Sequence, residues 1–200
     1  PMAATFVVSL TAKSGDFLWV QHMVKSMARK TGRMAVVLPH GVLFRMSKEG
    51  KIRRKLLEMD ILEAVIGLGQ NIFYGTGLAP CFLIFRESKP KAYRQKVLFI
   101  DASKELKIGR AQNELLPEHV DNIHRWYEAY QDVEGICRVA TLDEIRENDF
   151  NLNIPRYVEP VIEEESKTID QAIANLKGSL QAAYAAEDRL KELLIREGLL

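Results

Sequence analysis

The stretch that decides the fold is residues 62–86, LEAVIGLGQNIFYGTGLAPCFLIFR. The apolar run LEAVIGL is followed by a glycine-rich loop and then by a second apolar run, APCFLIFR. Two such runs joined by turn residues predict a β-hairpin. Phe73 and Tyr74 lie at its tip, although a globular chain usually buries its aromatic side chains inside regular elements. The position of this aromatic pair is therefore the main functional question.

Further apolar runs flank the hairpin. RMAVVLP, residues 33–39, carries apolar residues on consecutive positions, so we expect a central strand of a parallel sheet that is buried on both faces. KVLFID, residues 96–101, is a further predicted strand. Helical spacing and capping residues predict helices that begin near Asp16, Ser47, Pro117 and Thr141. This order predicts the α/β class, with too few strands for a complete doubly wound sheet.

The C-terminal region is predicted to be a separate helical tail. Pro155 and Pro160 bracket a linker, which divides a domain at residues 1–159 from a tail at 160–200. Residues 161–197 form one helical pattern with an apolar seam at alternating steps of four and three residues. The seam residues are Ile169, Ile173, Leu176, Leu180, Leu190 and Leu194, with polar breaks at Ser166 and Glu187. Periodicity alone leaves open whether this seam packs on its own domain or on another protein.

Composition limits the functional classes. The net charge is +1, so any contact with nucleic acid has to come from local basic patches. Two cysteines and four histidines show no metal-ligand spacing, so we predict no metal site and a reducing, cytoplasmic setting. No apolar run reaches membrane-spanning length, and we expect no membrane partner. The start, PMAAT, indicates a piece of a longer protein without a signal peptide.

Two basic segments are candidates for contact with DNA phosphates. Residues 45–55 hold six positive residues against one Glu, and residues 86–96 hold five against one. The alternative is that both are ordinary solvated faces. The candidate phosphate contacts are Arg45, Lys48, Lys51, Arg53, Arg54, Lys89 and Lys91.

The aromatic pair also has two interpretations. Phe73 and Tyr74 could be core residues, or they could form a platform on which a base stacks. The preceding GLGQNI lacks the third glycine of a dinucleotide-binding loop, so its glycines are interpreted as turn residues.

A long part of the sequence resembles a known family. GRMAVVLPHGVLFRMSKEGKIRRKLLEMDILEAVIGLGQNIFYGTGLAPCFLIFR is similar to the modification (M) subunit of type I restriction–modification systems, and so are KVLFIDASKE, RAQNEL and NDFNLNIPRYV. These subunits are S-adenosylmethionine-dependent adenine-N6 DNA methyltransferases. The resemblance covers about residues 16–160 in register. It implies a Rossmann-like sheet with a reversed terminal hairpin.

The resemblance also implies site residues. In this family, the aromatic in the loop before the hairpin packs on the flipped adenine; by position this is Phe73, with Tyr74 as the second choice. The family's Asn-Pro-Pro-aromatic motif and glycine-rich cofactor loop are both missing from this sequence. We therefore assign no catalytic residue and expect the C-terminal part of a subunit, unable to methylate DNA alone. His40 stands where the family often has Asn.

The implied partners are double-stranded DNA, the specificity subunit, a second M subunit and the restriction subunit. M subunits use C-terminal helices to contact the specificity subunit, which favours the tail as a docking helix. One alternative is a non-catalytic module that bridges a catalytic core and the specificity subunit. A methyltransferase acting on RNA or protein shares the predicted sheet but not the long match.

Overall fold

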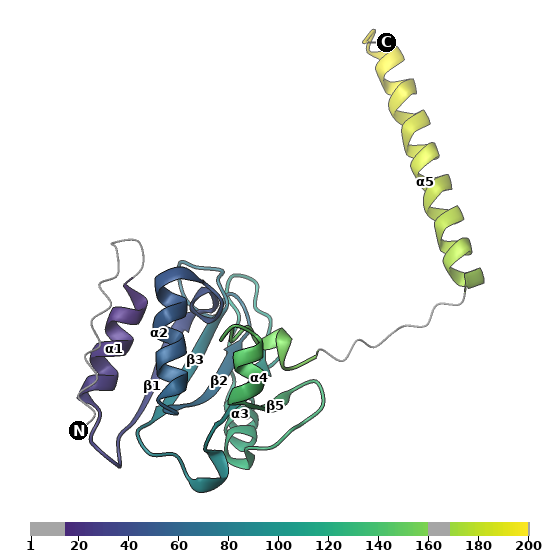
Figure 1. Ribbon diagram of the computed structural model, residues 1–200. Coiled ribbons are helices and arrows are strands. Elements are labelled where there is room, and N and C mark those ends of the chain that lie inside the picture. Colours follow the sequence, from purple (N-terminus) through teal and green to yellow (C-terminus); the bar gives the residue numbers. More distant parts are fainter. Residues whose placement is uncertain (1–14, 160–168, 200) are drawn as a thin grey trace. The chain divides into compact units, whose positions relative to one another are not determined.

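The computed structural model describes residues 15–159 and 169–199. The chain divides into two compact units, Pro1–Val161 and Ile162–Leu200. The first unit contains a mixed sheet between layers of helices (Figure 1). The second contains a single described helix.

The strands of the first unit form one five-stranded sheet with the order β1-β3-β2-β4-β5. β2 pairs with β4 in parallel, whereas β3 pairs antiparallel with both β1 and β2, and β5 pairs antiparallel with β4. The predicted hairpin is therefore present as β2 and β3. The strand bounds are β1 (Arg33–Pro39), β2 (Leu62–Leu68), β3 (Pro80–Arg86), β4 (Lys96–Ala102) and β5 (Cys137–Thr141).

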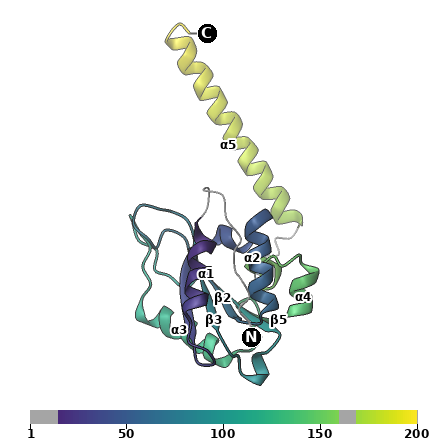
Figure 2. The same cartoon turned by 60° about the vertical axis from the view of Figure 1, so that its left-hand side comes forward.

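Helices cover both faces of the sheet (Figure 2). One face packs against α1, α2 and α4, and Val65 and Phe99 point into this core. The other face packs against α3, and Ile66 and Ile100 point into that core. The helix bounds are α1 (Asp16–Ser26), α2 (Ser47–Glu58), α3 (Pro117–Ala129) and α4 (Leu142–Glu147), with 3-10 turns at His40–Leu43, Lys91–Tyr93 and Ile154–Arg156. Successive side chains of the central strands point to opposite faces, and both faces are covered, which builds the three layers.

The expectation for β1 was wrong. Among the described residues, β1 is an edge strand that pairs only with β3, and antiparallel. Arg33, Ala35 and Val37 face outward and are exposed, so the strand is not buried on both faces. Consecutive apolar residues did not reveal which neighbours the strand has, because pairing depends on topology rather than on local pattern.

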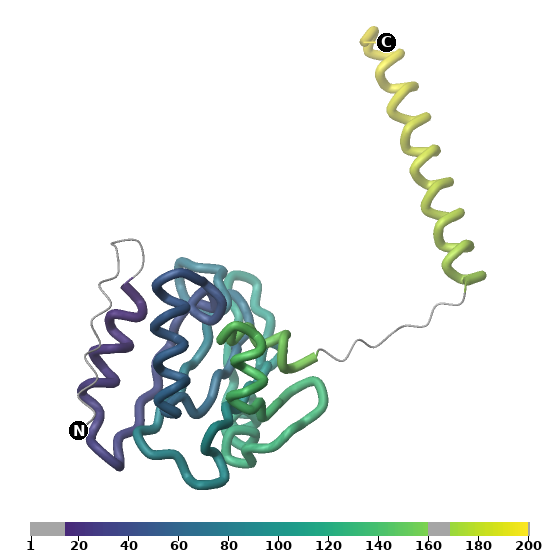
Figure 3. The backbone as a smooth tube through the Cα atoms, in the orientation of Figure 1, coloured from purple at the N-terminus to yellow at the C-terminus, as the bar shows by residue number. Residues whose placement is uncertain are grey.

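The topology brings two loops to one edge of the sheet. β1 and β2 are both antiparallel to β3 and are therefore parallel to each other, as β2 is to β4. The carboxyl ends of these three strands lie at the same edge. Residues 69–79, the Phe73 loop, follow β2 there, and residues 103–114, the 103–114 loop, follow β4 (Figure 3). Ligands of open α/β sheets bind at such an edge.

The second unit contains α5 (Ile169–Arg196), a helix of 28 residues. It runs without interruption through Gly178 and is about 42 Å long at 1.5 Å per residue. Within this unit the predicted seam is open to solvent: Ile169, Ile173, Leu176, Leu180 and Leu190 are exposed, and Leu194 is half-buried. Ser166 lies outside the described residues. None of the described helices is long and apolar enough to cross a membrane.

Candidate nucleic-acid interface

Phe73 borders an apolar hollow at the carboxyl edge of the sheet. Its side chain is 46% exposed, whereas that of Tyr74 is 92% exposed. The hollow has a volume of about 360 Å³. Its lining residues are Val37, Leu38, Pro39, Phe73, Thr76, Leu78, Ala79 and Pro80. A half-exposed ring at the border of a hollow can stack on a planar ligand.

The hollow is built by two parts of the chain. The end of β1 supplies Val37 to Pro39, and the end of the Phe73 loop with the start of β3 supplies the remainder. Pairing of Pro39 with Pro80 in the β1–β3 ladder fixes these two parts side by side. Phe73 is the one aromatic residue of the lining and Tyr74 is outside it. The geometry therefore favours Phe73 over Tyr74 as the ring that faces a ligand.

His40 lies next to the hollow, directly after β1. Its main-chain N–H donates to the carbonyl of Ala79 at 3.3 Å, while its buried ring Nε2 has no hydrogen-bond partner in the described part of the chain. Burial lowers the pKa of His40 below its usual value of 6.5, although a main-chain hydrogen bond at Pro80 and the charge of Asp101 oppose this. The ring is therefore neutral at physiological pH, and His40 is suited to packing rather than to binding phosphate.

Gly67 in β2 gives the His40 ring its space. A Cβ at this position would lie 3.3 Å from Nε2 of His40 and 2.5 Å from Cδ1 of Ile154. The second distance is too short for any non-bonded carbon pair. Any side chain at this position would therefore force Ile154 to shift, which favours glycine here.

Arg53 of the first basic segment is a core residue. It is 1% exposed, and its guanidinium donates to the carbonyls of Phe150 at 2.7 Å, Val42 at 3.0 Å and Arg45 at 2.9 Å. Burial lowers its pKa to about 10, which leaves it charged at neutral pH. Because this guanidinium is buried and donates to three main-chain carbonyls, we remove Arg53 from the candidate phosphate contacts.

The other members of this segment lie at the surface. Arg45 is half-buried and forms ion pairs of 3.4 Å with Asp16 and with Glu49. Arg54 pairs with Glu58 at 2.7 Å, and its guanidinium lies 5.0 Å from the ring centre of Phe150. The side chains of Lys48 and Lys51 are exposed on α2. These four residues remain candidates for contact with a polyanion.

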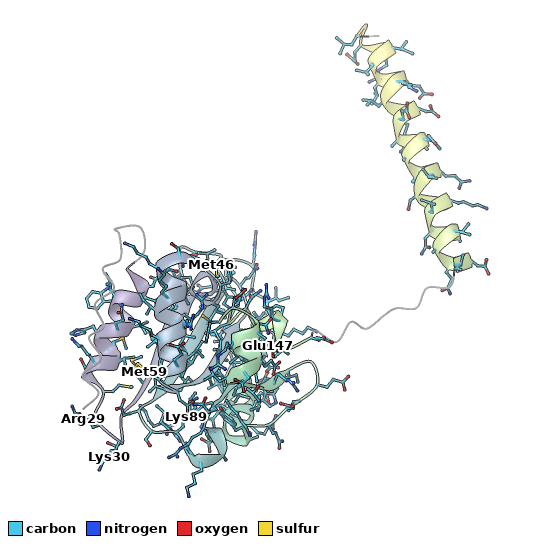
Figure 4. The ribbon with its side chains drawn as sticks, in the orientation of Figure 1. Arg29, Lys30, Met46, Met59, Lys89 and Glu147 are labelled. Atoms are coloured by element: carbon cyan, nitrogen blue, oxygen red, sulfur yellow. The ribbon has the colours of Figure 1, made fainter. Side chains whose placement is uncertain are left out.

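The second basic segment lies at the opposite edge of the sheet. It follows β3, which runs antiparallel to β2, so a strand length of about 20 Å separates it from the Phe73 loop. Lys89, which is labelled in Figure 4, is 4% exposed. Its ammonium group donates to Asp60 Oδ1 at 2.8 Å and to the Lys96 carbonyl at 2.7 Å. Lys89 is therefore a structural residue, whereas Lys91 is exposed at this distant edge. The two basic segments do not flank the aromatic loop.

Sequence reasoning missed the contacts between the two loops at the carboxyl edge. The Asn113 main-chain N–H donates to the Asn71 carbonyl at 2.8 Å, and Asn113 Nδ2 donates to the Gln70 carbonyl at 2.9 Å. Asn71 Nδ2 donates to the Ala111 carbonyl at 3.2 Å. Gln112 Nε2 donates to the carbonyl of Ile72. The only local sign of these contacts in the sequence is the pair of side-chain amides, Gln112 and Asn113, in the segment RAQNEL.

The comparisons with known proteins agree with this fold. A family model described as N-6 DNA Methylase matches residues 4–166, and the chain belongs to this family. The methylase subunit of the MjaVII type I restriction enzyme from Methanocaldococcus jannaschii is 40% identical over 185 residues, which cover 91% of this chain and 30% of that protein. The methylase subunit of the HindI type I enzyme from Haemophilus influenzae is 28% identical, over 89% of this chain and 42% of that protein. The chain thus spans less than half the length of either relative.

Solved structures support the same assignment. A type I restriction–modification methyltransferase subunit from Streptococcus thermophilus superposes with a TM-score of 0.69 and 41% identity, over 73% of this chain and 31% of that chain. The EcoKI M protein superposes with a TM-score of 0.59 at 21% identity, which shows a shared fold alone. The predicted α/β class, with its terminal hairpin and long C-terminal helix, is confirmed.

Proposed function

We propose that this chain is the C-terminal part of a type I modification subunit that methylates adenine at N6 in double-stranded DNA. In this proposal Phe73 packs on an adenine that has been flipped out of the duplex. The observation that carries the proposal is the half-exposed Phe73 ring at the border of the apolar hollow. The family membership and the similarity to type I methylase subunits support it.

The energies are consistent with a single stacking ring. Stacking of a base on an aromatic side chain contributes about 1–3 kcal/mol, while extrusion of a base from a duplex costs a few kcal/mol. One ring therefore offsets part of the cost, and contacts to the DNA backbone have to supply the remainder. The cations that remain for this role near α2 are Arg45, Lys48, Lys51 and Arg54.

The lining of the apolar hollow beside Phe73 does not fit S-adenosylmethionine. The hollow is lined by apolar side chains and one threonine, without an acidic side chain to bind the ribose or the amino group of the cofactor. We therefore place cofactor binding in the remainder of the parent subunit, and we infer that this chain does not methylate DNA alone. Titration calorimetry with S-adenosylmethionine is expected to show no tight binding; tight binding would contradict the inference.

DNA binding by the isolated chain tests the role of Phe73. The probe is a duplex with an unpaired adenine, and fluorescence anisotropy measures its Kd. Phe73→Ala is expected to weaken binding about 5- to 150-fold, which corresponds to the loss of one stack of about 1–3 kcal/mol. Tyr74→Ala is the matched control and is expected to change Kd less than twofold. Equal affinities for wild type and Phe73→Ala would contradict the proposal.

We further propose that α5 docks on the helical regions of the specificity subunit, within a complex that also holds a second M subunit and the restriction subunit. The exposed apolar side chains at heptad spacing support this. Replacing Ile173 and Leu180 by Asp is expected to abolish co-purification with the specificity subunit. Lys177→Asp, an exposed change on the same helix, is expected to leave it intact. Unchanged co-purification of the seam variant would overturn this proposal.

The second candidate is a non-catalytic assembly module that bridges a catalytic core and the specificity subunit. The exposed seam of α5 and the missing catalytic motif favour it. The gene sequence before Pro1 separates the two candidates, because only a methyltransferase subunit encodes Asn-Pro-Pro-Phe and a glycine-rich loop there. In either case we place the protein in the cytoplasm, where Cys81 and Cys137, both free and buried, stay reduced.

A further inference from the structure

The 103–114 loop is tied to the part of the Phe73 loop that directly precedes Phe73. The four hydrogen bonds between the two loops reach residues 70–72, directly before Phe73. Packing reinforces the hydrogen bonds: a Cβ at Gly69 would lie 2.0 Å from Cδ2 of Leu106. The two loops are therefore expected to move together rather than independently.

The 103–114 loop is also ordered internally. Lys107 and Glu114 pair through their main chains, with N–O distances of 2.8 and 3.0 Å. The Asn113 side chain accepts from the Gly109 N–H at 3.2 Å. Asn113 thus binds the tip of its own loop with its carbonyl oxygen and the Phe73 loop with its amide nitrogen. A loop held in this way presents its tip at a fixed position.

The tip carries the side chains expected of a surface that contacts DNA. Lys107 and Arg110 are exposed, and neither side chain has an ion-pair partner among residues 15–159. Ile108 between them is 84% exposed. A large apolar side chain flanked by two cations matches a duplex, whose phosphates bind cations and whose base edges and sugars offer apolar surface.

We propose that the 103–114 loop is a second DNA-contacting element, which acts as one unit with the Phe73 loop. Lys107 and Arg110 bind phosphates next to the extruded nucleotide, and Gln112 and Asn113 hold the Phe73 loop in position. The inference rests on the proposed function, since it places the phosphate contacts beside the flipped base. Gln112 and Asn113 are positioning residues.

The salt dependence of DNA binding tests the phosphate contacts. For the double variant Lys107→Ala/Arg110→Ala, the slope of log Kobs against log [NaCl] is expected to fall by about 1.8, or about 0.9 for each lost contact. The control is Arg29→Ala/Lys30→Ala, which removes two exposed cations from the turn before β1, at the opposite end of the sheet (Figure 4). Its slope is expected to be unchanged. An unchanged slope in the loop variant would overturn the proposal.

A double-mutant cycle tests the positioning role. Asn113→Ala is expected to weaken binding to the duplex with an unpaired adenine by a factor similar to Phe73→Ala, without changing the salt slope. The double variant is expected to bind no more weakly than Phe73→Ala alone, because both changes remove the same stack. Fully additive losses would refute the coupling.

Failures of the two proposals are distinguishable. If Phe73→Ala weakens binding while the Lys107/Arg110 variant binds as wild type, the proposed function stands and the second DNA contact does not. If the Lys107/Arg110 variant shows the reduced salt slope while Phe73→Ala does not change the Kd, the loop binds DNA and the stacking role fails. Both cations are exposed, so their removal leaves the fold intact, and thermal unfolding monitored by circular dichroism verifies this.

Discussion

Replacement of Arg53 by Ala tests the assignment of this arginine to the core. The change removes the only side chain that donates to the carbonyls of Phe150, Val42 and Arg45 in the described part of the chain. A buried polar group left without a partner costs about 1–3 kcal/mol, so three of them cost about 3–9 kcal/mol before relaxation. Water that enters the cavity left by the side chain will form hydrogen bonds with some of these carbonyls and reduce the cost. We therefore expect a loss of about 3–5 kcal/mol.

Urea unfolding monitored by circular dichroism measures the loss. The free energy of unfolding of an ordinary domain is about 5–15 kcal/mol, so a loss of about 3–5 kcal/mol is expected to lower the urea midpoint of Arg53→Ala by about a fifth or more. Arg54→Ala is the matched control on the same helix. Its side chain is 59% exposed and pairs with Glu58 at the surface, where an ion pair contributes about 0–1 kcal/mol. If the two variants were equally stable, the reasoning about Arg53 would be refuted.

Two further predictions concern His40 and Gly67, whose positions are in close contact. Because burial lowers the folded-state pKa of His40, the unfolded chain binds its proton more readily, so stability is expected to fall as pH drops below about 6.5. His40→Asn should lose this part of the pH dependence in urea titrations at pH 7 and pH 5, and an unchanged dependence would exclude His40 as its source. Gly67→Ala is expected to destabilise by about 1–3 kcal/mol through overpacking. Adding Ile154→Val, which removes the Cδ1 atom that lies 2.5 Å from the new Cβ, should recover part of this loss in the same assay; no recovery would mean that the clash lies elsewhere.

The hairpin and most helices could be predicted because their signals are local. The apolar runs of β2 and β3 and the turn residues between them define the hairpin without reference to the remainder of the chain. The Thr141 hydroxyl accepts from the N–H of Glu144 at 3.2 Å, as the capping box predicts. The strand β5 was not predicted, since it has five residues and includes the exposed Arg138.

The charged residues were harder to predict, because burial of a charge depends on partners that are distant in sequence. Arg53 and Lys89 were interpreted as surface cations, but their partners include Phe150 and Asp60, at separations of 97 and 29 residues. Similarly, Glu63 is 1% exposed within β2 and pairs with Arg86 at 2.7 Å. Local composition contains no information about such contacts. The fold brings these charges together with groups that satisfy them.

The position of Phe73 was predictable only in part. Its loop followed from the sequence and its role from a family resemblance, whereas the hollow beside it depends on the pairing of β1 with β3. That pairing joins segments separated by the whole of α2 and β2. The hydrogen bonds from Asn113 to the Phe73 loop cross a similar interval and have no local signature.

Fluorescence of 2-aminopurine tests the central claim most directly. The probe is a duplex with 2-aminopurine opposite an abasic site, where the base is bright because it is already poorly stacked. When the wild-type chain binds, stacking on the Phe73 ring is expected to quench the 2-aminopurine fluorescence. At a saturating concentration of the Phe73→Ala variant, the fluorescence is expected to stay bright. If both complexes show the same fluorescence, Phe73 does not hold the base and the account of this interface is incorrect.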